Sequence, residues 1–182
     1  PMAKPATVTN SPRRTPHKKS ESLTDKAYSE LEELIVTLQL EPGEVLSEVA
    51  LSAELRIGRT PIREALQRLA REGLVTILPR KGVLVSDINP RKQLLLLEVR
   101  RELARLIAKS AAQRCTPEER AAFTAIADGI DKASRENDDI SFMRYDDELN
   151  KLMARASHNE YANRAIGLMH GLSRRFWYMH YK

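Results

Sequence analysis

The chain of 182 residues is long enough for one medium-sized domain or two small ones. Hydrophobic residues make up 42% of it and aromatic residues only 5%, and this balance, with many Leu, Ala, Glu and Arg residues, favours helices. The single cysteine, Cys115, excludes an internal disulfide and any zinc site built from several cysteines.

No apolar run approaches the roughly 18 residues that a membrane-spanning helix needs. The first residues are polar and contain proline, without the apolar segment of a secretory signal. The sequence therefore predicts a cytoplasmic protein with no membrane partner.

The charged residues are distributed unevenly along the chain. Residues 1–20 carry five basic residues and no acid, residues 21–55 carry one basic residue against nine acids, and residues 56–82 carry seven basic residues against two acids. A short basic segment behind an acidic one is typical of a local surface for a polyanion.

The N-terminal part predicts a tail followed by two helices. Residues 1–22 are rich in Pro, Ser, Thr and Lys, and they are predicted to form a disordered basic tail. Helical spacing of apolar residues predicts a helix over residues 24–39, capped by Thr24. A shorter helix is predicted to follow Ser47 and to end near Arg56.

Thr60 and Pro61 predict the start of a third helix, which runs to Glu72 because Gly73 stops it. At 100° per residue this helix has an apolar face of Ile62, Ala65, Leu66 and Leu69. Its opposite face is polar and contains Arg59, Thr60, Arg63 and Gln67.

That polar face is suited to the major groove of DNA. A helix N-terminus attracts phosphate through its free N–H groups and its dipole. Arg59 and Arg63 lie one turn apart and can each donate two hydrogen bonds to guanine, while Thr60 can contact a phosphate or a thymine methyl group.

After the third helix, residues 75–78 and 83–85 predict two short strands around a turn that contains Pro79 and Gly82. Basic residues at the tip suit contact with the DNA backbone or the minor groove, and glycine lets the chain pass close. The predicted contacts from this hairpin are Arg80, Lys81 and Gly82.

Arginines on a single exposed helix face are usually solvated surface. Three helices and a basic hairpin in this order, however, are typical of a winged helix-turn-helix that binds DNA. A winged helix used for protein interaction stays an alternative, which steep salt dependence of DNA binding would exclude. A metal-dependent enzyme is a weaker alternative, because the sequence has no catalytic motif tied to a fold.

The rest of the chain predicts only helices. The fold expected is therefore mainly α: a winged helix-turn-helix with a two-stranded wing over residues 23–86, a linker over 87–90, and an all-α helical bundle over 91–182. The expected helices of this second domain lie near residues 91–114, 117–136, 139–157 and 160–181.

The run GRTPIREALQRLAREGLV, with the preceding EPGEVLSE and the following PRKGVLV, closely resembles the GntR family of bacterial regulators. The helical remainder resembles the FadR-type (FCD) subfamily. The resemblance implies a homodimer that binds double-stranded operator DNA through Arg59, Thr60, Arg63 and the wing residues 80–82. Two departures stand out: Gly58 occupies a position where many relatives have Ser or Thr, and Val49 one where a relative has an arginine.

The resemblance also implies a pocket for a small-molecule effector in the helical domain, which in many relatives holds a divalent metal. Asp146 matches the acidic ligand of that metal, but Asn150 stands where the family has histidine and binds transition metals more weakly. The residues themselves leave open whether these two side chains mark a pocket or a buried–exposed boundary. Arg100 matches an arginine that faces the pocket in relatives and can pair with a carboxylate.

The sequence thus predicts a transcription regulator, repressor or activator, that binds effector through Arg100, Asp146 and Asn150. The effector expected is a carboxylate metabolite that changes the spacing of the two winged domains. Asp146 is the one residue assigned to a divalent metal, and no other cofactor is expected.

Overall fold

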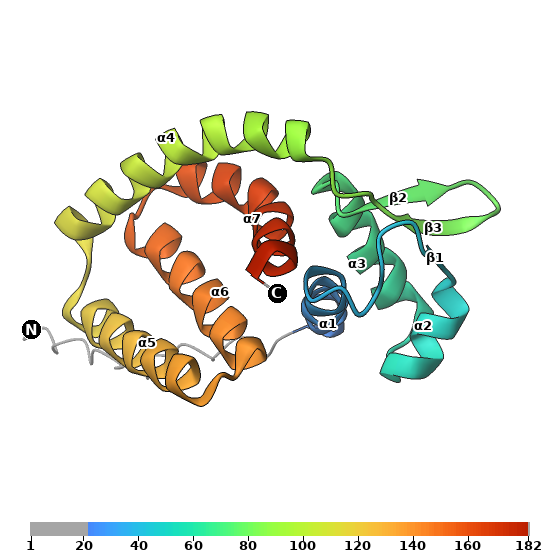
Figure 1. Cartoon of the computed structure of the whole chain (residues 1–182), viewed down its shortest axis with the longest axis horizontal. Helices are drawn as coiled ribbons and strands as arrows, with labels where there is room; N and C mark the ends of the chain where they lie inside the picture. Colours follow the sequence, from blue (N-terminus) through green and yellow to red (C-terminus); the bar gives the residue numbers. More distant parts are fainter. Residues whose placement is uncertain (1–21, 182) are drawn as a thin grey trace, which may run out of the picture.

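A computed structural model describes residues 22–181, and the predicted tail lies outside this range apart from Ser22. Figure 1 shows a winged domain at one end of the molecule and a helical domain at the other. The elements in chain order are α1 (Leu23–Val36), β1 (Val45–Leu46), α2 (Glu48–Leu55), α3 (Arg59–Arg71), β2 (Val75–Leu78), β3 (Gly82–Val85), α4 (Pro90–Arg114), α5 (Pro117–Glu136), α6 (Asp139–Ala156) and α7 (Glu160–Tyr181). The predicted fold class is confirmed.

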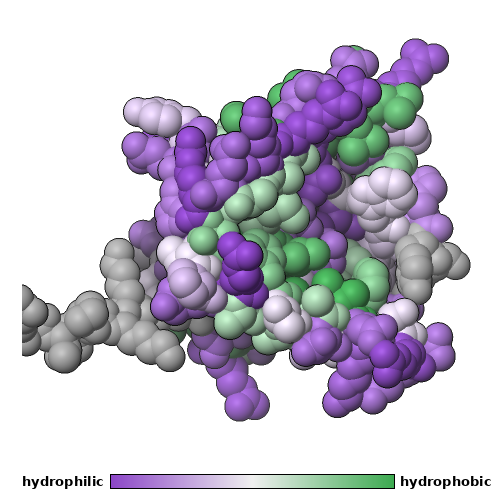
Figure 2. Space-filling model, turned by 90° about the vertical axis from the view of Figure 1, so that its left-hand side faces the viewer, coloured by the Kyte–Doolittle hydropathy of each residue, from purple (hydrophilic) through white to green (hydrophobic). Residues whose placement is uncertain are grey.

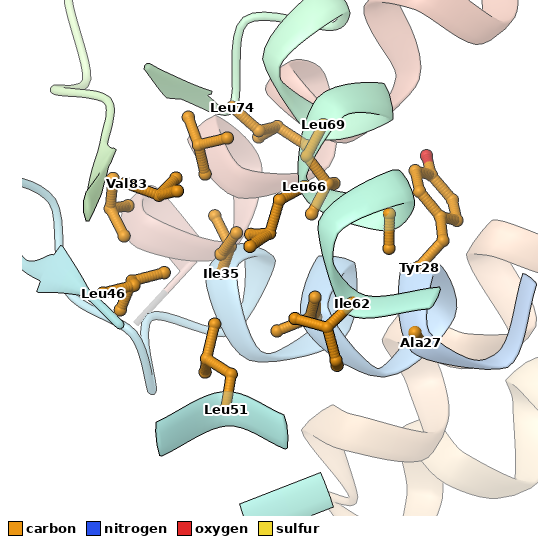
Figure 3. Close-up of a cluster of buried hydrophobic side chains, with 14 of the residues drawn as sticks. Ala27, Tyr28, Ile35, Leu46, Leu51, Ile62, Leu66, Leu69, Leu74 and Val83 are labelled. Carbon is orange, nitrogen blue, oxygen red and sulfur yellow. The ribbon is translucent and has the colours of Figure 1, made fainter. Parts of the chain in front are cut away.

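The core of the winged domain lies between α1, α2, α3 and the sheet, as Figure 3 shows. The predicted apolar face of α3 is confirmed, since Ile62, Ala65, Leu66 and Leu69 are at most 1% exposed. Burying side chains of this size contributes about 1.5–3 kcal/mol each, which holds α3 against α1 and leaves its polar face outward.

Two predicted helix caps were wrong. The N-cap of α1 is Ser22, whose hydroxyl accepts from Asp25 N at 3.0 Å, while the hydroxyl of Thr24 donates to Glu64 instead. The N-cap of α3 is Gly58, with no side-chain hydrogen bond, so Thr60 lies inside the first turn. Both helices begin earlier than predicted because a polar residue in the first turn can be mistaken for a cap.

The sheet has three strands in the order β1–β3–β2, all antiparallel, where the sequence predicted two. The additional strand, β1, pairs Val45 with Leu84 and Leu46 with Val83. Two residues are too few for an alternating pattern, so this strand could not be recognised before its partner was in place.

The helical domain consists of long helices, and α4 arches over α5, α6 and α7 (Figure 1). The predicted starts of two helices are confirmed: Asn89 caps α4, and Thr116 forms a capping box with Glu119 at the start of α5. On the face shown in Figure 2, apolar surface gathers in a central hollow ringed by hydrophilic residues. Within the described part of the chain, no helix has the length and apolar character that crossing a bilayer demands.

The two domains contact each other mainly through α1 and α7. A β-carbon added at Gly171 of α7 would lie 2.6 Å from Leu74 Cδ1, so α7 approaches the winged domain closely at this glycine. The side chain of Leu172 packs against the buried core of the winged domain. This contact places the helical domain directly against the winged domain beside α1.

Candidate DNA interface and effector pocket

The predicted polar face of α3 is exposed to solvent at all four positions, Arg59, Thr60, Arg63 and Gln67. The first turn of α3 contains no acidic residue, so nothing there offsets the positive end of the helix dipole. An arginine-bearing helix N-terminus with free N–H groups is a suitable binding surface for phosphate.

Arg63 is held by a carboxylate that the sequence analysis missed. Its Nε and Nη2 atoms donate to Glu48 Oε2 on α2, at 3.1 Å and 2.9 Å. Both residues remain partly exposed, with 59% of the Arg63 side chain and 28% of the Glu48 side chain open to solvent. No periodic signal connects two residues fifteen positions apart on different helices, so only packing of α2 on α3 could show this pair.

The tip of the wing is a tight turn in which Lys81 N donates to Leu78 O at 3.1 Å. Arg80 adopts a φ of 63° there, a left-handed conformation that favours glycine and costs an arginine about 1–2 kcal/mol. The side chains of Arg80 and Lys81 are exposed. A strained arginine at an exposed tip suggests selection for its charge over its backbone preference.

The backbone conformation and the packing of the sheet both require glycine at position 82. Its φ is 110°, and an added β-carbon would lie 2.6 Å from Leu46 O of β1. The close approach that the structure shows at Gly82 is therefore to the neighbouring strand.

The three predicted effector residues come together. Arg100 of α4 and Asp146 and Asn150 of α6 line one cavity of about 370 Å³. Asn150 Oδ1 accepts from Arg100 Nη2 at 3.3 Å, and the Asn150 amide donates to Asp146 O at 2.8 Å. The size suits a small metabolite.

The cavity has buried donors without partners among the described residues. Arg100 Nε, Ser173 Oγ and Arg174 Nε are all shielded from solvent and make no hydrogen bond. Burial lowers the pKa of Arg100, although the charge of Asp146 opposes this shift. An unpaired buried donor costs about 1–3 kcal/mol, and the positive charges of Arg100 and Arg174 beside the cavity favour an anionic ligand.

Seven lining residues were missed: Asp139, Phe142 and Met143 on α6, and a set of four on α7, Ser173, Arg174, Trp177 and Tyr178. The spacing of the four on α7 puts them on one face of the helix, and this pattern is visible in the sequence. The pattern alone did not indicate a pocket, because the same spacing is typical of ordinary helix packing.

The residues of this cavity do not fit a metal ion. The carbonyl oxygen of Asn150 already accepts from Arg100, and a guanidinium beside Asp146 repels a cation. Among residues 22–181 there is no group of three or more His, Cys, Asp and Glu side chains that could hold one. Each histidine in the described part of the chain has another partner: His158 contacts Glu119, His170 contacts Asp147, and His180 contacts Phe176 O.

A larger cavity of about 760 Å³ lies between the two domains and shares Arg100 and Asn150 with the first. Its walls carry charges of both signs that pair with each other, as Arg68 does with Asp25 and Glu72. These internal pairs leave it less suited to an anion than the smaller cavity.

Comparison with known proteins agrees with this division of the chain. The profile of the "Bacterial regulatory proteins, gntR family" matches residues 23–85, and the profile of the FCD domain matches residues 95–182. The Nta operon transcriptional regulator of Aminobacter aminovorans is 37% identical over 86 residues, which cover 47% of this chain and 41% of that protein. The HTH-type transcriptional regulator McbR of Escherichia coli is 26% identical over 117 residues, which cover 64% of this chain and 53% of that protein.

The solved structure of E. coli McbR/YncC has the same fold, with a TM-score of 0.74 at 21% identity over 87% of this chain and 76% of that one. A GntR regulator from Rhodococcus follows with a TM-score of 0.64 at 18% identity, over 86% of this chain and 74% of that one. The chain spans less than two thirds of the length of the relatives that it matches in sequence.

Proposed function

Because the chain belongs to the GntR family of bacterial regulatory proteins and carries an FCD domain, we propose that it is a sequence-specific transcription regulator controlled by a small carboxylate effector. It acts as a homodimer on a short palindromic operator. Binding of the effector in the helical domain changes how well the two winged domains match the operator.

The DNA contacts proposed are those of the exposed face of α3 and the wing. Arg59 and Arg63 contact guanine edges in the major groove, with Thr60 and Gln67 beside them, and Arg80 to Gly82 contact the backbone or the minor groove. The absence of acid from the first turn of α3 supports this assignment, because a carboxylate there would repel the phosphates.

The observation that carries the effector proposal is the set of unpartnered donors around one small cavity. Arg100, Ser173 and Arg174 come from two helices and line a cavity of about 370 Å³, and each has one buried donor atom without a partner among the described residues. Two of these residues are arginines, and their positive charges beside the cavity favour a carboxylate there. Asp146 and Asn150 would then contact the polar remainder of the effector, and a divalent metal has no part in this proposal.

The homodimer is supported by an apolar stripe on α4. Leu95, Val99 and Leu106 are between 46% and 64% exposed, and their spacing of four and seven residues aligns them on one helix face. An exposed apolar stripe of this kind is suited to a second copy of the chain.

Selection from a pool of genomic DNA fragments, at a low and a high salt concentration, tests the DNA-binding part. The wild type should enrich a short palindrome and lose affinity steeply with salt, because each phosphate contact releases counterions. Arg59→Ala combined with Arg63→Ala should abolish the enrichment, at about 1–3 kcal/mol for each lost guanine contact.

If a folded dimer enriched no sequence, and the double variant behaved like the wild type, the winged domain would instead be a protein-interaction module. Circular dichroism and light scattering of the same samples establish that both proteins are folded and dimeric.

Thermal denaturation with a panel of mono-, di- and tricarboxylates tests the effector part. A carboxylate that binds the native state raises the melting temperature. At a ligand concentration of one hundred times the dissociation constant, the free energy of unfolding increases by about 2.7 kcal/mol. Arg100→Gln should remove this rise, while Arg101→Gln should keep it, since Arg101 is exposed and pairs only with Glu102. Equal responses from the wild type and Arg100→Gln would contradict the carboxylate proposal.

A further inference from the structure

One turn of α7 contacts the winged domain and the effector cavity at the same time. On one side, Gly171 and Leu172 pack against the winged domain, and Arg175 donates to the linker carbonyls of Ser86 at 2.7 Å and Asp87 at 3.4 Å. On the other side, Ser173 and Arg174 line the effector cavity. Any movement of this turn therefore changes both the contact with the winged domain and the lining of the effector cavity.

Within this turn, Arg174 has a buried ionic contact with the winged domain. Its Nη1 atom lies 3.4 Å from Glu32 Oε1 on α1 and 3.5 Å from Asp147 Oδ1 on α6. The side chains of Arg174 and Glu32 are each only 5% exposed. Breaking a buried pair of this kind leaves an uncompensated charge, so the contact is costly to lose.

Arg174 also lines the effector cavity, and one of its donors lacks a partner among the described residues. Arg174 Nε is buried without a hydrogen-bond partner, while Nη2 donates to Met143 O at 3.2 Å. The guanidinium is planar and moves as one rigid group, so a shift of Arg174 toward a carboxylate in the cavity also moves Nη1 relative to Glu32. Glu32 and the cavity thus compete for one rigid group.

We propose that Arg174 is the residue that couples effector binding to the DNA-binding domain, by exchanging its contact with Glu32 of α1 for a contact with the carboxylate of the effector. This inference rests on the proposed function and adds its mechanism. The exchange leaves Glu32 without its cationic partner and loosens the contact between α1 and α7. By linkage, operator binding and effector binding then change each other's affinity by the same factor.

A neighbouring ion pair provides the matched control. Glu33 lies next to Glu32 on α1 and also bridges the domains, with Arg144 Nη2 of α6 donating to Glu33 Oε1 at 2.6 Å. This pair is partly exposed and lies outside the effector cavity. Its loss weakens the domain contact but leaves the Glu32–Arg174 contact in place, because Arg144 acts on Glu33 more strongly than Arg174 does.

The test places a carboxylate in the cavity without requiring the identity of the effector. Trp177 lines the cavity, is 56% exposed and lies three residues after Arg174, so Trp177→Glu can reach Arg174 on the same helix face and is tolerated at an exposed position. Trp177→Gln has the same length without the charge. Each variant is combined with Glu32→Gln and, separately, with Glu33→Gln, and hydrogen exchange of α1 and operator affinity are measured.

Relative to Trp177→Gln, Trp177→Glu should speed amide exchange in α1 and change the operator affinity by at least fivefold. Glu32→Gln should remove this difference, and Glu33→Gln should leave it intact. Equal effects of Trp177→Glu in all three backgrounds would overturn the role of Arg174. Failure of every variant and the wild type to bind an operator would contradict the proposed function, while the exchange measurement would still decide the coupling.

Discussion

Arg63 of the recognition helix α3 and Glu48 of α2 form a two-point ion pair at the surface where DNA is proposed to bind. A surface pair of this kind contributes about 0–1 kcal/mol, whereas an arginine that contacts guanine through two hydrogen bonds contributes about 1–3 kcal/mol. The DNA contact is therefore the stronger of the two, and Glu48 directs Arg63 before binding without preventing it.

Glu48→Gln should reduce sequence discrimination and increase non-specific affinity. Without its carboxylate partner Arg63 samples more rotamers, so we expect the ratio of operator to non-specific affinity to fall about three- to tenfold. Non-specific affinity should rise because one negative charge near the phosphates is removed. Competition binding with operator and scrambled DNA measures both affinities. Glu54→Gln on the same helix is the control. If it had the same effect as Glu48→Gln, the change in net charge alone would explain the result.

Arg80→Gly should stabilise the protein and weaken its binding to DNA. Glycine adopts the φ of 63° without the penalty that arginine incurs, so the free energy of unfolding should rise by about 1 kcal/mol. The plot of log affinity against log salt should become shallower by about one unit, because one phosphate contact is lost. Arg80→Lys retains both the strain and the charge, so it should keep most of the DNA affinity. If Arg80→Lys lost as much DNA affinity as Arg80→Gly, a role for charge at the tip would be contradicted.

Leu95→Glu combined with Val99→Glu should dissociate the dimer. Both side chains are exposed on one face of α4, so the change removes apolar contact area and places like charges opposite each other in the proposed interface. Sedimentation should show a folded monomer, with at least tenfold weaker binding to the palindrome and little change for a half-site. The exposed pair Arg101→Gln and Arg105→Gln makes the same change in net charge elsewhere on α4 and should leave the dimer intact.

Asp147→Asn should destabilise the protein at neutral pH, and less so in acid. Burial alone would raise the pKa of Asp147, but the hydrogen bond from His170 and the charges of Arg174 and Lys151 lower it well below its usual range. A carboxyl group with a lowered pKa stabilises the native state above about pH 4, and this contribution is lost as the pH falls below that value, where only the unfolded chain takes up the proton. Urea denaturation at pH 7 and pH 3 should show a difference of about 2–3 kcal/mol that shrinks in acid.

The opposite shift at Glu32 should oppose part of this pH dependence. Burial raises the pKa of Glu32 above its usual value, while the charge of Arg174 lowers it. A raised carboxyl pKa stabilises the native state at low pH, and this contribution is lost as the pH rises through the native pKa. The free energy of unfolding of Asp147→Asn should still approach that of the wild type as the pH falls, and parallel profiles would contradict the ionised state of Asp147.

Periodicity and cap residues in the sequence determined most of the fold. The apolar stripe of α3, the capping residues Asn89 and Thr116, and the basic hairpin each depend on neighbours in the chain, and the structure confirms these features. Local interactions need only the order of residues, since helical spacing and backbone hydrogen bonds extend over a few positions. The family and the winged architecture followed from these local signals.

Tertiary structure decided the features that join distant segments. Strand β1 exists because β3 lies beside it, Glu48 meets Arg63 because α2 packs on α3, and Arg174 meets Glu32 because α7 crosses behind α1. Nothing in the local sequence distinguishes Arg174 from a solvated arginine, because its partners are 142 positions away on α1 and 27 positions away on α6. Only the folded chain excludes water from the guanidinium of Arg174. A buried charge needs a partner, and Arg174 finds one in the winged domain, at Glu32.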